Sequence, residues 1–110
     1  MIFVTGPLFA GKRDYIAHAL HLTEEELSRC AVWDVQDLAA ESDDLNALAD
    51  RLCQYSVVIA TEIGGGVVPV EEKQRRDREA AGRLACLLAQ RADTVIRVCC
   101  GLPQFLKGTL

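Results

Sequence analysis

The stretch that decides the fold is Gly6-Pro7-Leu8-Phe9-Ala10-Gly11-Lys12, near the start of the 110-residue sequence. It fits the pattern G-x-x-x-x-G-K, in which glycines let the backbone turn tightly and aim N–H groups at phosphate oxygens. An apolar run at 2–4 precedes it and a helical pattern at 12–22 follows, so it joins a strand to a helix. The helix N-terminus and Lys12 both add positive charge. We predict a phosphate loop; the alternative is an ordinary turn with two glycines and a solvated lysine.

The residue after the lysine departs from the usual pattern. In phosphate loops the residue after the lysine is Ser or Thr, and the hydroxyl of that residue ligates Mg²⁺. This chain has Arg13 at that position. A guanidinium has no acceptor atom and cannot bind a metal, although it can stabilise phosphate charge directly. Asp34 ends the apolar run 31–33, where a carboxylate that orients Mg²⁺ would lie. The simpler interpretation of Asp34, a residue that starts a turn, stays open.

Outside the loop, apolar runs alternate with helical patterns. Strands are expected at 2–4, 31–33, 56–61 and 94–100, the last one stopped by Gly101 and Pro103. Helices are expected at 12–22 and 24–29, from the cap Ser42 to Leu52, and at 71–92. Such alternation gives a parallel sheet with helices on both faces. We therefore predict one α/β domain over residues 1–110, a three-layer phosphate-loop NTPase-like fold with about four parallel strands.

A glycine-rich segment follows the third predicted strand. Glu62 precedes Gly64-Gly65-Gly66, and ligands in open α/β sheets bind beyond the carboxyl ends of strands. Glu62 is thus a candidate to point into the same crevice as Lys12, the alternative being a surface acid on a flexible loop. On the next helix, Arg75 and Arg78 share a flank. They face either a phosphate or a neighbouring subunit, or they are simply solvated.

Composition argues against several classes of function. Twelve basic and sixteen acidic residues give a net charge of -4, which disfavours a general nucleic-acid or anionic-membrane surface. One Trp and two Tyr offer no stacking platform for single-stranded nucleic acid, and no apolar run approaches the roughly 18 residues of a membrane span. Five cysteines without CxxC spacing predict packed thiols in a reducing cytoplasm rather than disulfides or a zinc site.

Three blocks resemble the adenosylcobinamide kinase / adenosylcobinamide-phosphate guanylyltransferase family of cobalamin biosynthesis. They are the strand and loop at 2–12, the segment 62–69 with Arg75 and Arg78 in register after it, and the C-terminal stretch 92–107. The resemblance implies a kinase that uses GTP or ATP to phosphorylate the aminopropanol hydroxyl of adenosylcobinamide. It also implies a second step that transfers GMP from GTP through a covalent histidine, a carboxylate role for Asp34 beside the metal, and a homo-oligomer.

The histidine of that family lies in an H-H-x-x-R-type segment between the first helix and the Walker-B-like strand, and this sequence has no such segment. His18 and His21 lie in the loop's own helix and do not match it. We therefore expect the guanylyltransferase step to be absent. The part of the family's sequence that is missing here includes a strand as well as the histidine segment. If that strand lies at the edge of the sheet, the four strands predicted here, numbered in chain order, lie side by side in the order 4-1-3-2.

Two classes of function remain open on the sequence. In the kinase interpretation, Lys12 and the 6–11 backbone hold phosphates, Asp34 orients Mg²⁺, and Glu62 contacts the nucleotide or activates the acceptor hydroxyl. The alternative is a nucleotide-binding or subunit-interaction protein without catalysis, which Arg13 and the missing histidine segment favour. A weaker third possibility is an oligomer whose loop binds only inorganic phosphate or sulfate.

Overall fold

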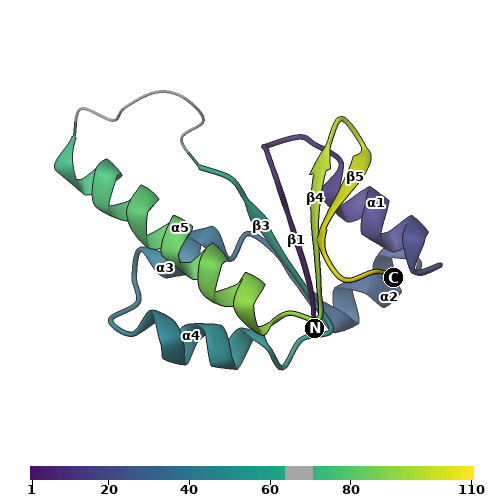
Figure 1. Ribbon diagram of the computed structural model, residues 1–110, viewed down its shortest axis with the longest axis horizontal. Helices are drawn as coiled ribbons and strands as arrows, with labels where there is room; N and C mark the ends of the chain where they lie inside the picture. The colour runs from purple at the N-terminus through teal and green to yellow at the C-terminus, as the bar shows by residue number, and fades with distance from the viewer. Residues whose placement is uncertain (64–70) are drawn as a thin grey trace.

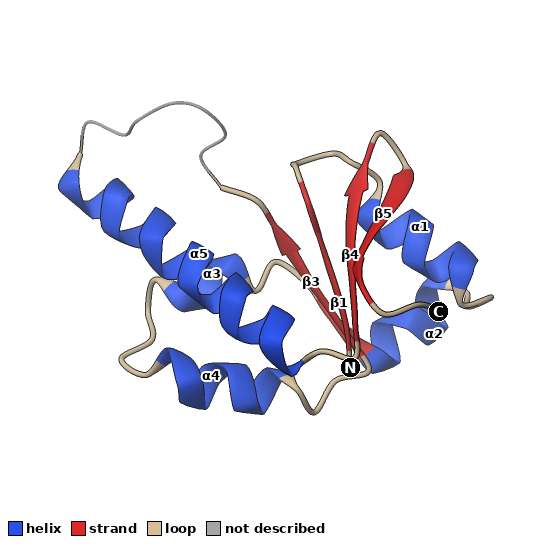
Figure 2. Ribbon diagram, in the orientation of Figure 1, coloured by secondary structure: helices blue, strands red, loops and turns tan. Residues whose placement is uncertain are grey.

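A computed structural model describes residues 1–63 and 71–110 of the chain. Helices cover both faces of one sheet, α1 and α2 on one side and α3, α4 and α5 on the other, which makes three layers (Figures 1 and 2). The elements in chain order are β1 (Ile2–Gly6), α1 (Lys12–Ala19), α2 (Glu24–Cys30), β2 (Ala31–Val32), α3 (Gln36–Ala39), α4 (Leu45–Leu52), β3 (Val57–Thr61), α5 (Glu72–Arg91), β4 (Thr94–Cys99) and β5 (Leu102–Lys107).

The sheet has the order β2-β3-β1-β4-β5. β1 pairs in parallel with β3 on one side and β4 on the other, and β2 pairs in parallel with β3. The predicted order 4-1-3-2 of the parallel strands and the phosphate-loop NTPase-like α/β class are therefore confirmed. The strand that leads into the loop lies inside the sheet, where neighbours on both sides fix it.

The strand predicted at 94–100 does end before Gly101, since β4 ends at Cys99, but it is not the last strand, because β5 follows it. Gly101 has φ 73° and turns the chain, which then returns antiparallel to β4. Pro103 is tolerated there because an edge strand leaves some N–H positions without a ladder partner. The expected set of about four parallel strands thus gains an antiparallel edge strand, every residue of which is exposed.

Short polar motifs start two of the helices. The capping box predicted from Thr23 and Glu26 is present, with each side chain accepting from the backbone N–H of the other residue at 3.1 Å. α4 is capped by Asp44 and not by Ser42: the Asp44 carboxylate accepts from the N–H of Ala47 at 3.1 Å. Ser42 lies in the turn before the helix, where its hydroxyl accepts a hydrogen bond from the backbone N–H of Asp44.

Two apolar clusters enclose the sheet, one on each face. Phe3 of β1 belongs to the cluster under α3, α4 and α5, and its neighbour Val4 to the cluster under α1 and α2. Both are at most 2% exposed. Burial of each such side chain contributes about 1.5–3 kcal/mol before entropy is counted, so β1 is a rigid support for the loop at its carboxyl end. No helix in the described ranges is long and apolar enough to cross a membrane.

Candidate functional site

Both glycines of the loop motif adopt conformations that favour glycine. Gly6 has φ 151°, and a Cβ there would lie 2.1 Å from the carbonyl oxygen of Val98 on β4, which is far inside van der Waals contact. Gly11 has φ 83° and is the N-cap of α1, in the left-handed region. The turn from β1 into α1 therefore requires the glycines at both positions, and it brings the loop backbone to the N-terminus of a helix.

Lys12 folds back over the loop that precedes it. Its ammonium donates a hydrogen bond of 2.7 Å to the carbonyl oxygen of Pro7, and the residue is only 8% exposed. Burial lowers the pKa of Lys12 below its ordinary value, while the carboxylates of Asp34 and Glu62 act in the opposite direction. A cation is thus held inside the loop, with two carboxylates favouring its charged form.

The loop, Arg13 and Asp34 meet in one cavity of about 370 Å³. Asp34 directly follows Trp33 beyond β2, is exposed, and has φ 57°. Gly6 and Pro7 precede this lining in the chain, and Glu62, which was expected in the same crevice as Lys12, lines a different cavity. That lining consists of Leu8, Phe9, Ala10, Gly11, Lys12, Arg13, Asp14, Glu24, Trp33, Asp34, Ile59 and Thr61.

Arg13 occupies the position of the usual hydroxyl and lies over an aromatic ring. The carbon at the centre of its guanidinium is 4.2 Å from the centroid of the Trp33 ring, a cation–π distance. Trp33 is half-buried and packs against the apolar cluster under α1 and α2. A fixed cation therefore stands where a magnesium ligand is expected, and the residues present do not fit a magnesium site of the usual kind.

Glu62 forms an ion pair with Arg97, a residue that was not predicted to belong to the site. Arg97 of β4 donates to both of its carboxylate oxygens, at 2.6 and 3.0 Å. The backbone N–H of Glu62 donates to the carbonyl oxygen of Gly6 at 2.9 Å, which ties it to the start of the loop. The ion pair raises the pKa of Arg97. An arginine within the otherwise apolar run 95–98 is the signal that could have revealed it.

The two predicted arginines lie one turn apart on α5. Arg78 lines a second cavity of about 260 Å³ together with Glu62 and Gln36. Arg75 lies in the first turn of α5. The structure therefore brings Arg78 and Glu62 to the wall of one cavity. The glycine-rich segment at 64–66 and Pro69 fall outside the described residues.

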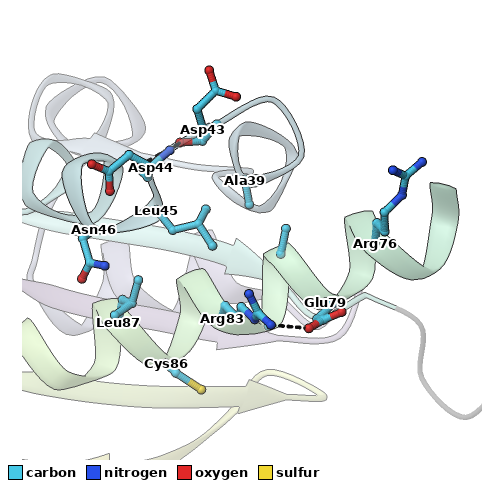
Figure 3. A pocket seen from close by; sticks show the side chains of 13 residues that line it. Ala39, Asp43, Asp44, Leu45, Asn46, Arg76, Glu79, Arg83, Cys86 and Leu87 are labelled. Atoms are coloured by element: carbon cyan, nitrogen blue, oxygen red, sulfur yellow. Dashed lines mark hydrogen bonds and ion pairs between the residues drawn. The ribbon is translucent and has the colours of Figure 1, made fainter. Parts of the chain in front are cut away.

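A larger hollow lies elsewhere, between α5 and the connection from α3 to α4 (Figure 3). It is an open groove of about 1140 Å³ that none of the predicted site residues lines. Asp43 and Asp44 border it on one side and Arg76 on the other, and an ion pair joins Arg83 to Glu79 at 2.5 Å. Size alone does not mark the site; we favour the phosphate loop because its backbone is shaped to bind anions.

A family model described as CobU, cobinamide kinase / cobinamide phosphate guanyltransferase, matches residues 14–106. The chain belongs to this family. The match confirms the family that the sequence resembles. It begins directly after the loop at 6–12, so the assignment of that loop rests on its pattern and on the geometry above. The CobU family also accounts for the mostly parallel α/β sheet flanked by helices.

One curated relative is the bifunctional adenosylcobalamin biosynthesis protein CobP of Pseudomonas aeruginosa. It is 36% identical over 75 residues, which cover 68% of this chain and 43% of that protein. The matched stretch thus spans less than half of the relative's length. The name of that protein assigns it to adenosylcobalamin biosynthesis, and the activity of the present chain is a matter for proposal.

Proposed function

We propose that this CobU-family chain binds the phosphates of GTP or ATP in the loop 6–12 and transfers a phosphoryl group to adenosylcobinamide in cobalamin biosynthesis. The observation that carries the proposal is the loop itself. Two glycines with positive φ join a buried strand to a helix N-terminus, and the Lys12 ammonium lies across the turn. The family match supports the acceptor and the pathway. The guanylyltransferase step is left out of the proposal because the sequence lacks the H-H-x-x-R-type segment.

Each residue has a physical role in this scheme. The N–H groups of the loop and of the first turn of α1 bind phosphate oxygens, and Lys12 exchanges its bond to Pro7 for one to the bound phosphate. Burial lowers the pKa of the Lys12 ammonium, and the carboxylates of Asp34 and Glu62 offset part of that lowering. Phosphoryl transfer needs little covalent chemistry from a protein, so positioning and charge neutralisation supply most of the rate.

A nucleotide-binding protein without catalysis is the second candidate, and the Arg97–Glu62 pair favours it. Glu62 would activate the acceptor hydroxyl by accepting its proton, but both of its oxygens already accept from Arg97. An acceptor hydroxyl would therefore share this carboxylate with the guanidinium of Arg97. Arg78, in the same cavity as Glu62, is the residue we propose to face the acceptor or the nucleotide, and Arg75 would face a neighbouring subunit.

A titration by isothermal calorimetry tests the proposal. GTP, ATP and inorganic phosphate are titrated into the wild-type chain, into Lys12→Ala and into Lys73→Ala. Lys73 is a matched control, because it is an exposed lysine that pairs only with Asp77 among its described contacts. Loss of Lys12 should weaken nucleotide binding at least about tenfold, the usual effect of a lost charge-assisted hydrogen bond, while the control binds normally.

The outcomes separate the candidate functions. Binding of a nucleotide together with transfer of labelled γ-phosphate to adenosylcobinamide supports the kinase. Binding without transfer supports the non-catalytic protein. Binding of phosphate alone points to the simplest anion site, and no binding of any of the three overturns both nucleotide proposals. We further propose that the chain works as a homo-oligomer in the cytoplasm.

A further inference from the structure

The charges around the loop differ from those of a loop that works with magnesium. Lys12 and Arg13 are adjacent cations at the first two positions of α1, where the helix N-terminus adds its own partial positive charge. Three carboxylates, those of Asp14, Glu24 and Asp34, line the same cavity. Within residues 1–63 and 71–110, no three or more acidic, histidine or cysteine side chains are grouped so as to hold a metal ion.

We propose that Arg13, held on the ring of Trp33, neutralises nucleotide phosphates in place of a divalent cation, so that the loop binds GTP or ATP independently of Mg²⁺. This inference rests on the proposed function, since it concerns the same loop. It goes beyond it by naming the group that supplies the missing charge. The three observations that carry it are the position of Arg13, its 4.2 Å stacking distance and its place in the cavity wall beside the loop.

The chemistry of arginine suits this role. The guanidinium keeps its charge at all physiological pH values and presents five donors in a plane, which matches two phosphate oxygens at once. Stacking on Trp33 restricts the long side chain before any ligand arrives, so less rotamer freedom is lost on binding. The Trp33 ring is itself held by the apolar cluster under α1 and α2. Arg13 is exposed, so its donors are accessible to a ligand.

Arg13 also makes the binding of a divalent cation at this position unfavourable. A divalent cation held at this end of the loop would be close to the guanidinium, and the like charges would repel. A Ser or Thr hydroxyl would have supplied a ligand there, whereas arginine supplies none. Replacing Arg13 by Ser should therefore reverse the preference, because it removes the repulsion and adds a hydroxyl near the Asp34 carboxylate.

The test measures GTP and ATP affinity by calorimetry with EDTA and again with Mg²⁺. For the wild-type chain we expect the two dissociation constants to agree within about threefold. Arg13→Ser should bind at least about tenfold more weakly in EDTA and recover when Mg²⁺ is added. Arg13→Lys keeps the charge without the planar donors and should lie in between. Arg29→Ala, which removes an exposed arginine paired with Glu25, is the control and should match the wild type.

The failures can be told apart. If the wild-type chain binds nucleotide only when Mg²⁺ is present, or if Arg13→Ser binds as well as wild type in EDTA, the inference is overturned and the proposed function stands. If neither nucleotide binds in either buffer, the proposed function itself fails, and the inference with it. Circular dichroism of each variant verifies the fold, since Arg13 is exposed and its replacement should leave the helices intact.

Discussion

Arg97 and Glu62 hold each other through two hydrogen bonds, of 2.6 and 3.0 Å, across the carboxyl end of the sheet. Arg97 lies on β4 and Glu62 follows β3, and β1 runs between these two strands. Arg97 is the register partner of Thr5, one residue before the loop begins. The pair therefore spans the end of the strand that leads into the phosphate loop, and its carboxylate partner, Glu62, also acts to raise the pKa of Lys12.

Arg97→Leu should weaken nucleotide binding. The change removes a cation near the loop and leaves the Glu62 carboxylate uncompensated, so a bound polyphosphate meets additional repulsion. We expect a loss of roughly threefold to tenfold in affinity at low salt, and a smaller loss at high salt because exposed charges are screened. Calorimetry at two salt concentrations measures both. Adding Glu62→Gln to this variant should restore part of the affinity; an affinity unchanged at low salt would show that the pair lies outside the site's electrostatic reach.

Gly6 and Gly82 should respond to alanine in opposite ways. At Gly6 a Cβ would lie 2.1 Å from the Val98 carbonyl oxygen, and the chain must also hold φ 151°. We expect Gly6→Ala to lower the free energy of unfolding by about 2–4 kcal/mol. Gly82, inside α5, has no described heavy atom within 4 Å of its Cβ position, so Gly82→Ala should raise it by about 0.5–1 kcal/mol. Urea unfolding of both variants provides the comparison, and equal effects would contradict the loop geometry.

Nucleotide affinity should fall with rising pH earlier than an ordinary lysine predicts. Burial lowers the pKa of Lys12 from its ordinary value of 10.5, so the ammonium loses its proton below that pH. Affinity should decrease by about tenfold as the charge is lost. Lys12→Arg, which stays protonated, should show no such fall.

Rising pH should affect the stability of the fold in the opposite direction to nucleotide affinity. Between the lowered pKa and 10.5 the folded state binds fewer protons than the unfolded state, so the contribution of Lys12 to stability rises with pH through that window. Urea unfolding of the wild type and of Lys12→Arg over this range measures the difference. A contribution that declines with pH would mean that the lysine is not desolvated.

The exposed edge of β5 gives the proposed homo-oligomer a physical basis. Its residues 102–106 carry no charge, and Leu102 and Leu106 are 70% and 55% exposed. An uncharged apolar edge strand readily pairs with another strand. We expect Leu106→Lys to reduce the mass measured by light scattering after size exclusion. Leu38→Lys, at an exposed leucine 42% accessible on α3, should leave it unchanged. A wild-type chain that elutes as a monomer would contradict the proposal.

The parallel strands and their order could be predicted from the sequence because each is an apolar run bounded by turn residues. Val57–Thr61 is nearly all buried, as a run of β-branched residues predicts. The ends of the helices are harder to predict from the sequence. α1 ends at Ala19 and not at residue 22, because His21 adopts φ 57°. β5 was missed because Gly101 and Pro103 indicate a stop, and an edge strand tolerates the proline.

Part of the site follows from local pattern and part depends on contacts between distant residues. The loop at 6–12 could be predicted because glycine spacing, strand and helix are all consecutive in the sequence. The Arg97–Glu62 pair joins residues 35 positions apart, and the stacking of Arg13 on Trp33 joins a helix to a strand end.

The prediction that all five cysteines pack inside is wrong, because Cys86, Cys99 and Cys100 are exposed. Their apolar neighbours in the sequence do not indicate whether a cysteine side chain faces the core or the solvent.

The central claim, that the loop at 6–12 is the nucleotide-phosphate site, is tested most directly by backbone amide NMR during a GTP titration. The account predicts that the largest chemical-shift changes fall on the N–H groups of residues 8–13, with smaller changes at Trp33 and Asp34. Changes centred on the groove between α5 and residues 42–46, with the loop amides unmoved, would contradict it.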